Sequence, residues 1–554
     1  MTKFIVVAGG VISGVGKGVT TAGLGKVLRE YGYSVTLIKI DPYINVDAGT
    51  LRPTEHGEVW VTQDGGEIDQ DLGTYERFLG KPIPKKNSIT TGQIYQSVIQ
   101  KERAGHYLGK TVQFVPHIID EIKERIKHAA HGYDIAIVEI GGIVGDYENV
   151  PYLFAFKALE REIGAHNVAH VLVTYLPVPE HIGEMKTKPT QQAIRLMGQE
   201  GLLPNFIICR SEKPLDAIRK KKIEEVANVP SENVISAPNV SNIYQIPLDL
   251  VREGLGNKLL QHLHLEPRKK PVCARWKQLI SQLQQATKSV TIGIIGKYVE
   301  SGDFALTDSY VSVYHALVHA AAHCSLQVSI RWLDAKQFER DAQTACQELN
   351  ELDGVVIPGG FGASGVEGKI TAIEYIRTHG IPYLGLCYGM QLAVIEYMRS
   401  VCGKKHAHTT EVAPDSQEPA VAVLPLQQAL LDKKELGGTM RLGSYAAQLH
   451  KGTRVYDLYA QMGWINADDT VYERHRHRYE VMPAAASVVQ QAGGCFSGCH
   501  NREDGTRLVE FFEVPNHPFF VATQAHPEFN SWFERPHPLF VGLISAAEKQ
   551  SAKH

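Results

Sequence analysis

Cys387 has surroundings in the sequence that point to nucleophilic chemistry. It lies in the middle of GLCYGMQ, residues 385–391, with one glycine two positions before it and another two positions after it. An apolar segment precedes this stretch and a helix-like segment follows it. The glycines permit the tight strand-to-helix turn that presents a nucleophile, and a helix N-terminus favours the thiolate form of a cysteine. Because an isolated buried cysteine is more often inert, the prediction depends on partner residues.

Partner residues for this thiol occur in QAHPEF, residues 524–529. His526 and Glu528 are two positions apart, and in the extended segment that we expect here they project to the same side. The carboxylate would then orient the imidazole, and the imidazole would activate the thiol. The sequence therefore predicts a triad of Cys387, His526 and Glu528.

A glycine-rich stretch, PGGFG at residues 358–362, follows the apolar run GVVI and is suited to the same site. Its flexible backbone N–H groups could form an oxyanion hole, for which Gly360 is the expected donor beside Tyr388. Three matching parts of the sequence thus support a thiol-based active site.

The segment YERHRHRYEV, residues 472–481, alternates arginine and histidine. In a strand, Arg474, Arg476 and Arg478 would share one face and form a positive strip. Such a strip could hold a carboxylate or a nucleotide phosphate. A solvated edge strand is the alternative interpretation.

The N-terminal stretch GGVISGVGKGVTTAGLGKVL, residues 9–28, follows an apolar run and opens a helix-like segment. This is the context of a phosphate-binding loop, in which backbone N–H groups and a helix N-terminus surround phosphate oxygens. Lys17 would add a point charge. The stretch departs from the common phosphate-loop pattern in two ways: five residues separate Gly10 from Gly16, and Gly18 follows Lys17 where serine or threonine is usual. A purely structural turn is the alternative, and the position after the first strand favours nucleotide binding.

Two acidic residues could supply the hard oxygen ligands that magnesium prefers. Asp71 lies in DQDLGTYERF, and Glu139 ends the apolar run IAIVE. A carboxylate at the end of a buried strand is costly without a partner, so we predict that both residues bind the metal beside a triphosphate. A helix-capping or salt-bridged acid is the alternative for each.

Polar loops follow several of the apolar runs. GEMKTKPTQQ at 183–192 carries Lys186 and Lys188, and similar polar stretches occur at 41–50 and 101–109. In isolation, the lysines of KTK would be interpreted as solvated surface residues. Because ligands bind at the carboxyl edge of a doubly wound sheet, these loops together favour a binding site.

The elements that must position these residues are strands alternating with helices. Within the first 250 residues the apolar runs are KFIVVAGG, SVTLIKI, DIAIVEIGG, HVLVTYLP and NFIICRS. They are rich in valine and isoleucine and do not alternate with polar residues, as expected for parallel strands buried on both faces. The sequence predicts an α/β fold with a doubly wound domain of the phosphate-loop type first.

The pattern breaks between residues 254 and 289, where it indicates two short helices joined by a segment rich in proline and lysine. Apolar runs then resume with VTIGIIGKY, QVSIRWL, LDGVVIPGG, IPYLGLC, FFEVPN and FFVATQAH, which predict a second α/β domain. We expect a nucleotide-binding domain at 1–268, a linker at 269–289 and a second α/β domain at 290–546.

Composition agrees with a globular enzyme. The chain has 554 residues, 44% of them hydrophobic, and a formal charge of −3, so nothing marks it as a nucleic-acid-binding protein. No stretch of about 18 apolar residues occurs, and the N-terminal apolar run is shorter than a signal peptide, so we expect no membrane segment and a cytoplasmic location.

The eight cysteines are scattered and suggest no disulfide framework. Cys495, Cys499 and His500 resemble metal-ligand spacing but lack a second pair, so we interpret them as part of a surface loop rather than a zinc site.

These stretches closely resemble the CTP synthase family, class I glutamine amidotransferases that make CTP from UTP, ATP and glutamine. The motifs that carry the resemblance occur in the family's order across nearly the whole chain: GVGKG, KIDPYINVDAGT, HGEV, DLGTYERF, TTGQIYQSVI, KERAGHYLG, VEIGG, GDYE, KTKPTQ, PGGFG, GLCYGMQ, GGTMRLG, ERHRHRYEV, EVPNHPF and HPEF.

The resemblance implies that the domain at 290–546 is a class I glutaminase domain, and it implies roles for individual residues. ATP would be bound by Ser13, Gly14, Val15, Gly16, Lys17, Gly18 and Asp71, with magnesium at Asp71 and Glu139. UTP, and CTP as an inhibitor, would be bound by Ser13, Asp146, Tyr147, Glu148, Lys186, Thr187, Lys188, Gln191 and Lys222. Glutamine would be bound by Gly360, Gln391, Glu411 and Arg478. His56 resembles the family residue near the point where ammonia reaches the synthase site, and the family further implies GTP as activator and a homotetramer.

Two positions depart from the family's pattern. Tyr388 stands where leucine is usual, which should not disturb a backbone donor, and Ser364 stands where arginine is common, which leaves GTP activation open. Two other functions remain as alternatives. One is an amidotransferase of the cobyrinic acid diamide synthase type, which the motifs DPYIN and KTKPTQ disfavour. The other is a non-catalytic assembly protein, whose signature would be loss of Cys387, His526 or Glu528.

Overall fold

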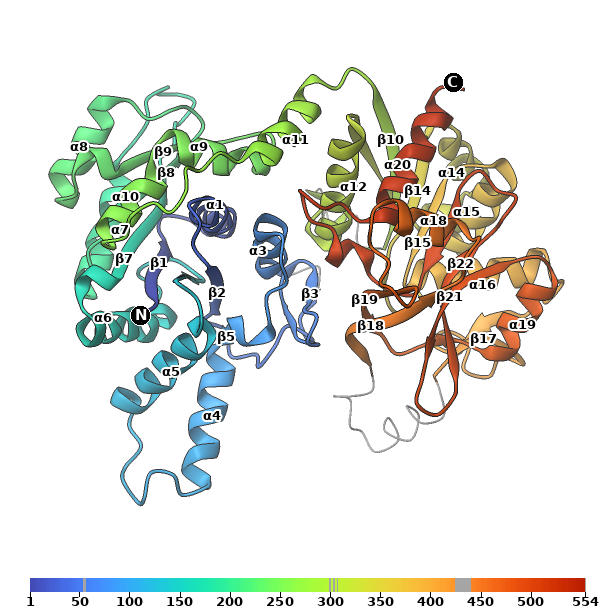
Figure 1. The fold of residues 1–554 in the computed structure, drawn as a ribbon, viewed down its shortest axis with the longest axis horizontal. Coiled ribbons are helices and arrows are strands. Elements are labelled where there is room, and N and C mark those ends of the chain that lie inside the picture. Colours follow the sequence, from blue (N-terminus) through green and yellow to red (C-terminus); the bar gives the residue numbers. More distant parts are fainter. Residues whose placement is uncertain (53–55, 298–299, 302–303, 306, 424–439, 554) are drawn as a thin grey trace. The chain divides into compact units, whose positions relative to one another are not determined.

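A computed structural model describes the chain except residues 53–55, 298–299, 302–303, 306, 424–439 and 554. The chain divides into two compact units (Figure 1). The first comprises residues 1–50 and 67–277, and the second comprises 51–66 and 278–554.

The first unit is built on a seven-stranded parallel sheet with the order β5-β2-β6-β1-β7-β8-β9. Its strands are β1 (Lys3–Gly9), β2 (Val35–Asp41), β4 (Glu67–Asp69, outside the sheet), β5 (Ser88–Thr90), β6 (Ile135–Ile140), β7 (Val168–Tyr175), β8 (Phe206–Ser211) and β9 (Val234–Pro238). Its helices are α1 (Lys17–Glu30), α3 (Asp71–Leu79), α4 (Thr91–Arg103), α5 (Ile119–Ala130), α6 (Val150–Ile163), α7 (Lys188–Gln199), α8 (Ala217–Ala227), α9 (Ile246–Arg252) and α10 (Leu255–His262).

Helices cover both faces of this sheet, as Figure 1 shows for α1 on one side and α5 and α6 on the other. Successive residues of β2 point to opposite faces: Leu37 lies against α1, whereas Ile38 and Ile40 join the core that includes α5 and α6. Every residue of β2 and β6 is buried, as expected for strands packed on both sides. The predicted doubly wound fold is confirmed.

The second unit contains a nine-stranded sheet with the order β13-β10-β14-β15-β23-β22-β21-β18-β19. Its strands are β10 (Ser289–Gly296), β13 (Gln327–Asp334), β14 (Gly354–Ile357), β15 (Tyr383–Leu386), β18 (Arg441–Leu449), β19 (Thr470–His477), β21 (Cys495–Asn501), β22 (Arg507–Glu513) and β23 (Phe520–Thr523). Shorter strands are β3 (Val59–Val61), β11 (Glu300–Ser301), β12 (Phe304–Ala305), β16 (Ala407–Thr409), β17 (Glu418–Ala422) and β20 (Glu480–Val481). Its helices are α12 (Val311–Cys324), α13 (Gln337–Arg340), α14 (Ala342–Glu348), α15 (Val366–His379), α16 (Tyr388–Ser400), α18 (Arg454–Gln461), α19 (Pro483–Gln491) and α20 (Pro538–Ser551).

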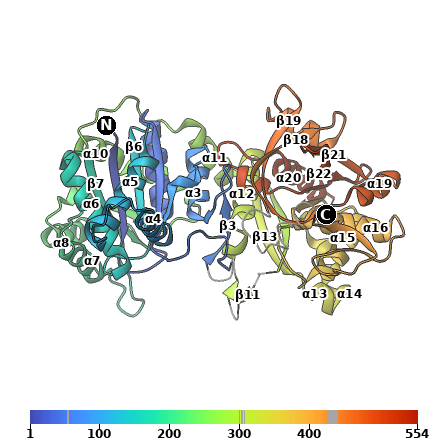
Figure 2. The same ribbon diagram turned by 90° about the horizontal axis from the view of Figure 1, so that it is seen from below.

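The first five strands of that order are parallel, and the remaining strands pair antiparallel. Figure 2 shows β18 and β19 together at the edge of this unit. The apolar runs of the sequence predicted the parallel strands together with β22. They did not predict β18, β19 and β21 as one antiparallel extension, because these strands carry many polar residues.

The compact units differ from the predicted boundaries in two places. Helix α11 (Ala274–Gln285) begins inside the predicted linker, and its Trp276 ring lies 5.4 Å from the Phe78 ring, so the first unit continues to Lys277. The two helices expected between residues 254 and 289 are present as α10 and α11.

The second difference is that residues 51–66 belong to the second unit. The ring of Trp60 packs 4.8 Å from Phe529, and Arg474 donates a hydrogen bond to the carbonyl of Val61 at 2.9 Å. Apolar periodicity carries no information about such long-range packing. This segment therefore supports the region around His526 although it is far from it in the sequence.

Candidate active sites

Cys387 occupies a sharp turn between β15 and α16. Its φ of 50° and ψ of −99° put it in a strained region of backbone space, and its N–H donates to the carbonyl of Thr523 at 2.7 Å. A side chain at Gly385 would meet the Tyr383 hydroxyl at 2.6 Å, and one at Gly389 would meet the Ile357 carbonyl oxygen at 2.2 Å. The predicted elbow geometry is confirmed, and close packing explains why both flanking residues are glycine.

His526 and Glu528 are brought together beside this turn. The Nδ1 atom of His526 lies 2.7 Å from Oε1 of Glu528, and both side chains are buried. The segment is not extended as expected: His526 caps a 3-10 turn, Pro527–Asn530, and that turn places Glu528 against the imidazole. The pairing was predicted correctly and the local conformation was wrong.

Gly359 shows how close the imidazole and the thiol are. A side chain there would meet Cε1 of His526 at 2.8 Å and Cβ of Cys387 at 3.6 Å. The Nε2 atom of His526 is buried and has no hydrogen-bond partner within the part of the chain that the structure describes. This nitrogen is thus available for the proton of the thiol.

The charges at this site hold a proton on the imidazole. Burial lowers the pKa of His526, but the negative charges of Glu528 and Cys387 outweigh burial and raise it to about 10. The imidazole is therefore a strong acceptor for the proton of the thiol, and transfer of that proton gives the thiolate, which is the reactive form of a cysteine nucleophile.

The glycine-rich loop after β14 is held by hydrogen bonds to both the N–H and the carbonyl of Gly362. The Gly362 N–H donates to Oε1 of Glu411 at 2.6 Å, and the Tyr388 hydroxyl donates to its carbonyl at 3.3 Å. Lys297 donates to the carbonyl of Phe361 at 3.0 Å and also contacts that of Gly362. The loop that contains Gly360, the expected oxyanion donor, is thus fixed beside Cys387.

The residues expected to bind glutamine surround the same turn. Glu411 and Arg478 both lie near Tyr479. Burial and the charge of Glu411 raise the pKa of Tyr479, and the charge of Arg478 offsets only part of this rise. Gln391 is 2% exposed, and its amide nitrogen already donates to the carbonyl of Tyr479 at 2.9 Å.

The predicted strip of three arginines does not form one exposed face. Strand β19 ends at His477, so Arg478 lies beyond it. Arg474 is fully buried, with its guanidinium 5.2 Å from the Trp60 ring, and Arg476 lies 5.4 Å from the Phe361 ring. A solvated edge strand is wrong as well, because His475 and His477 are also buried.

The phosphate-loop candidate of the first unit lies between β1 and α1. Val11, Gly14 and Gly16 have φ angles of 79°, 71° and 92°, a left-handed conformation that turns successive N–H groups inward. Helix α1 starts at Lys17 with no side-chain cap, which leaves its first N–H groups to a ligand. The geometry agrees with the predicted anion-binding loop.

Lys17 points back across this loop. Its Nζ donates to the carbonyl of Gly142 at 2.7 Å, and a side chain at Gly9 would meet that Nζ at 2.7 Å. Burial lowers the pKa of Lys17, and the charge of Glu139 partly offsets the effect. Arg210, which the sequence did not single out, lies beside the loop, 3.4 Å from a side chain built at Gly16.

Asp71 and Glu139 meet at a buried lysine. Lys39 contacts Asp71 and lies 3.0 Å from Oε1 of Glu139. Burial alone would lower the pKa of Lys39, but the charges of these two carboxylates outweigh burial and raise it. A side chain at Gly18 would meet Oδ1 of Asp71 at 2.4 Å, so this carboxylate adjoins the phosphate loop. Oδ2 of Asp41 is buried without a hydrogen-bond partner among the described residues.

This donor set fits magnesium, which prefers carboxylate oxygens and fills its other positions with water and phosphate. Within the described ranges there is no group of three or more His, Cys, Asp or Glu side chains that could hold a metal ion. Sequence reasoning missed Lys39 and Asp41, although a lysine and an aspartate within the apolar run VTLIKID were a signal.

The residues expected to bind the pyrimidine nucleotide lie around the start of α7. The amide of Gln191 donates to the Thr187 hydroxyl at 3.3 Å, and Lys186 lies 2.9 Å from Glu184. Lys222 on α8 also acts on the carboxylate of Glu184 and lowers its pKa, after the larger effect of Lys186. The structure thus brings these lysines together.

Lys188 begins α7 and is exposed, and Asp146 accepts a hydrogen bond from the Ile143 N–H at 2.9 Å. Tyr147 and Glu148 follow in an exposed 3-10 turn, Tyr147–Asn149. Ser13 is exposed within the phosphate loop.

Cys495, Cys499 and His500 lie in strand β21 and not in the surface loop that we expected. Arg507 donates to the sulfur of Cys499 at 3.1 Å, and His500 bonds the carbonyl of Ala446. All eight cysteines of the chain are free thiols.

Two family models together match most of the chain. The family described as "CTP synthase N-terminus" matches residues 3–265, and "Glutamine amidotransferase class-I" matches residues 305–546. CTP synthase of Pyrococcus abyssi is 49% identical over 549 residues, covering 99% of this chain and 98% of the relative. CTP synthase of Methanocaldococcus jannaschii is 47% identical over 555 residues, covering 100% of this chain and 99% of the relative.

Among solved structures, the glutaminase domain of Trypanosoma brucei CTPS with bound acivicin is 33% identical, with a TM-score of 0.42, and the match covers 47% of this chain and 94% of that one. The full-length relatives disfavour both alternatives that the sequence left open.

No helix in the described part of the chain is long and apolar enough to cross a bilayer. The chain belongs to the CTP synthase family of glutamine-hydrolysing ligases.

Proposed function

We propose that this chain aminates UTP to CTP at the expense of ATP, using ammonia that it releases from glutamine at Cys387. The observation that carries the proposal is the strained turn at Cys387 with a His526–Glu528 pair at 2.7 Å beside it, in a chain that also has a phosphate loop. Full-length similarity to CTP synthases supports the choice of substrates.

In the glutaminase half-reaction, the thiolate of Cys387 attacks the carboxamide carbon of glutamine. Backbone N–H groups of Gly360 and Tyr388 stabilise the oxyanion. The protonated imidazole of His526 gives its proton to the leaving nitrogen, and ammonia departs as a glutamyl thioester forms. His526 then takes a proton from water, which hydrolyses the thioester to glutamate.

Glu411 and Arg478 provide the opposite charges that the amino and carboxylate groups of free glutamine require. Since the Gly362 N–H occupies Glu411 at 2.6 Å in this structure, the amino group of glutamine would share or replace that bond. Gln391 borders the same site.

In the synthase half-reaction, the loop before α1 and Lys17 orient the γ-phosphate of ATP for attack by the 4-oxygen of UTP. This step converts a poor leaving oxygen into a phosphate, which ammonia then displaces. Magnesium, which Asp71 and Glu139 would hold, neutralises charge on the phosphates when bound. Lys186, Lys188 and Lys222 would bind the triphosphate of UTP.

Ammonia is mostly protonated near pH 7, and only the free base is nucleophilic. Release inside the protein, with passage to the synthase site out of contact with bulk water, delivers that form. His56 is the residue proposed to lie where ammonia reaches that site.

Product and effector control follow from the same chemistry. CTP carries the triphosphate of UTP, so it would inhibit by using the same lysines, together with Asp146 and Glu148. GTP would activate the glutaminase half-reaction, with Ser364 in place of the arginine common in the family. We further propose a homotetramer in the cytoplasm, where eight unpaired thiols would remain reduced.

The direct test is an assay with UTP, ATP, magnesium and glutamine in which CTP formation is followed by absorbance. CTP should accumulate only when all substrates are present, and ammonium chloride should replace glutamine. Glutamine hydrolysis without any CTP from either nitrogen source would contradict the proposal.

A further inference from the structure

A fully buried glutamine side chain lies against the nucleophile on the strand next to it. Gln524 directly follows β23, whose register pairs Leu386 with Thr523, so the two strands end side by side. The Gln524 N–H donates to the carbonyl of Glu510 at 2.9 Å, and its side-chain nitrogen lies 3.7 Å from the sulfur of Cys387. This contact has a geometry that a hydrogen bond to sulfur allows, and the catalytic roles given above do not use it.

One backbone carbonyl determines which end of the Gln524 amide faces the sulfur. The carbonyl of Tyr479 can only accept, so the group of Gln391 that lies 2.9 Å from it must be the NH₂. That NH₂ also lies 3.2 Å from the Gln524 side chain, which must therefore present its oxygen there. The NH₂ of Gln524 is then left to point at Cys387.

The same carbonyl also orders a buried pair of histidines. Nδ1 of His477 lies 3.1 Å from the Tyr479 oxygen and so carries a proton. Its Nε2 then accepts from Nδ1 of His475 at 2.9 Å. Nε2 of His475 faces Oε2 of Glu510 at 3.4 Å, and Arg441 donates to the other Glu510 oxygen at 2.8 Å.

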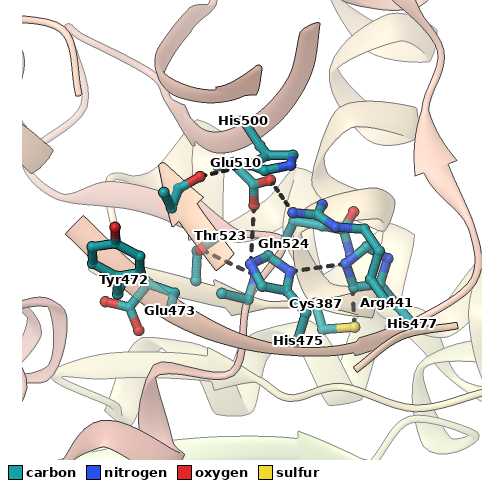
Figure 3. Close-up of polar contacts among 12 residues, drawn as sticks. Cys387, Arg441, Tyr472, Glu473, His475, His477, His500, Glu510, Thr523 and Gln524 are labelled. Atoms are coloured by element: carbon teal, nitrogen blue, oxygen red, sulfur yellow. Dashed lines mark hydrogen bonds and ion pairs between the residues drawn. The ribbon is translucent and has the colours of Figure 1, made fainter. Parts of the chain in front are cut away.

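The ionisation of these groups agrees with that assignment. Burial and the charge of Arg441 lower the pKa values of His475 and His477, so both are neutral, and burial raises the pKa of Glu510 to about 7. Glu510 can therefore be protonated near neutral pH, although its Oε2 atom and Nε2 of His475 have no hydrogen-bond partner among the described residues. Figure 3 shows the contacts of Glu510 with Arg441 and His475 and the contact of Gln524 with Cys387.

We propose that Gln524 is a further catalytic residue, whose side-chain N–H stabilises the thiolate of Cys387, and that Gln391 is the positioning residue that fixes its orientation. A hydrogen bond from a neutral amide to an anion favours the charged form of the acceptor. The proton of the thiol still goes to Nε2 of His526, and the amide keeps both of its own. This inference rests on the thiol chemistry proposed above.

Other groups also act on this sulfur and must be held constant in a test. They are His526, Lys369 and Tyr388, which all lie close enough to Cys387 to interact with its charge. Gln524 differs from them because it carries no charge and cannot titrate. Its contribution should therefore move the ionisation of the thiol without adding a second titration.

The test measures carbamidomethylation of Cys387 by iodoacetamide between pH 5 and 10, with site-specific mass spectrometry on the full-length protein and no substrates present. The midpoint of this profile reports thiolate formation. Gln524→Met, which lacks the donor, should raise the midpoint by about one unit, and Gln524→Glu, which adds a like charge, should raise it further. Gln391→Glu should also raise it, because a carboxylate cannot donate to the Tyr479 carbonyl.

Gln347→Glu is the matched control, because this exposed amide on α14 undergoes the same change of charge far from the sulfur in sequence. Its profile should match that of the wild type. If Gln524→Glu does not fold, Gln524→Asn, which keeps the amide but shortens its reach, should give the shift expected for the methionine variant. Unchanged midpoints in folded Gln524→Met and Gln524→Asn would overturn the proposal. Because no glutamine is used, that outcome is distinct from a failure of the wild type to hydrolyse glutamine.

Discussion

The thiol site of the second unit and the phosphate-loop site of the first unit manage buried charge in opposite ways. Around Cys387, the buried His475 and His477 are hydrogen-bonded to each other and neutral. Around Lys17, the side chains are strongly charged, and Lys39 lies between the carboxylates of Asp71 and Glu139.

This difference reflects what each reaction requires from the protein. A covalent nucleophile must have its base and hydrogen-bond donors in place before the substrate arrives, so the geometry is fixed by strand register and a strained turn. Phosphoryl transfer depends on charges that phosphates and magnesium neutralise, so an excess of ionised groups is expected before they bind. On the proposed function, the thiol site is thus assembled by the chain alone, whereas the phosphate site would be completed by its ligands.

Among substitutions that keep the thiol, the largest effect is expected from removing the charge that supports the imidazole. Glu528 is the main cause of the raised pKa of His526, so Glu528→Gln should lower that pKa and make the imidazole a weaker acceptor for the proton of the thiol. Glutamine-dependent CTP formation should fall by about 10²- to 10³-fold. Steady-state assays with glutamine and with ammonium chloride measure the two reactions separately.

Ammonia-dependent synthesis should remain, since it does not use the imidazole. Glu503→Gln, which neutralises an exposed acid of the same unit, is the control and should leave both rates unchanged. A parallel fall of both rates in Glu528→Gln would show that the two sites are not independent.

An intermediate effect is expected at the start of α7. Lys188→Ala should weaken UTP and CTP together, each by roughly tenfold, or about 1.4 kcal/mol, because one positive charge serves both triphosphates. Inhibition constants for CTP and KM values for UTP measure this. Lys221→Ala, an exposed lysine on α8, serves as the control. Unchanged CTP inhibition with tenfold weaker UTP would mean that the two nucleotides do not share the site.

The smallest effect concerns stability and not activity. The folded-state pKa of Glu510, about 7, lies above its ordinary value, so the folded protein binds this proton more tightly than the unfolded chain. The contribution of this proton to the free energy of unfolding is therefore fully present below the ordinary carboxyl pKa and decreases as pH rises toward 7. Glu510→Gln imitates the protonated acid and should not show this decrease.

Urea unfolding of wild type and Glu510→Gln at pH values from 5 to 8 measures the difference. The variant should gain stability relative to the wild type as pH rises through that window. A constant difference across it would mean that Glu510 does not carry the buried proton.

Local sequence patterns predicted much of both regions. The glycines around Cys387 predicted its turn, because no side chain fits there. Gly14 and Gly16 predicted the turn before Lys17, because their positive φ angles are rare in residues that carry a side chain. The apolar runs predicted most of the parallel strands, since complete burial leaves a continuous hydrophobic signature, but they did not include the short strands β5 and β9.

What the sequence did not reveal depends on contacts between distant segments. Residues 51–66 join the second unit through Trp60, and nothing in their local pattern indicates this. Gln524 contacts Cys387 only because β15 and β23 are paired, and the turn at His526 replaces an expected extended segment. Strand pairing and turn geometry of this kind are set by the whole fold.

The separation of the two sites is most directly tested by Cys387→Ala, assayed for CTP formation with glutamine and with ammonium chloride. A methyl group cannot form a thioester, so the glutamine-dependent rate should vanish while the ammonia-dependent rate is kept and rises with pH as free ammonia increases. Lys17→Ala should lose both rates, because both need the phosphate loop. Equal loss of both rates in a folded Cys387→Ala protein would contradict the assignment of glutamine chemistry to one unit and phosphoryl chemistry to the other.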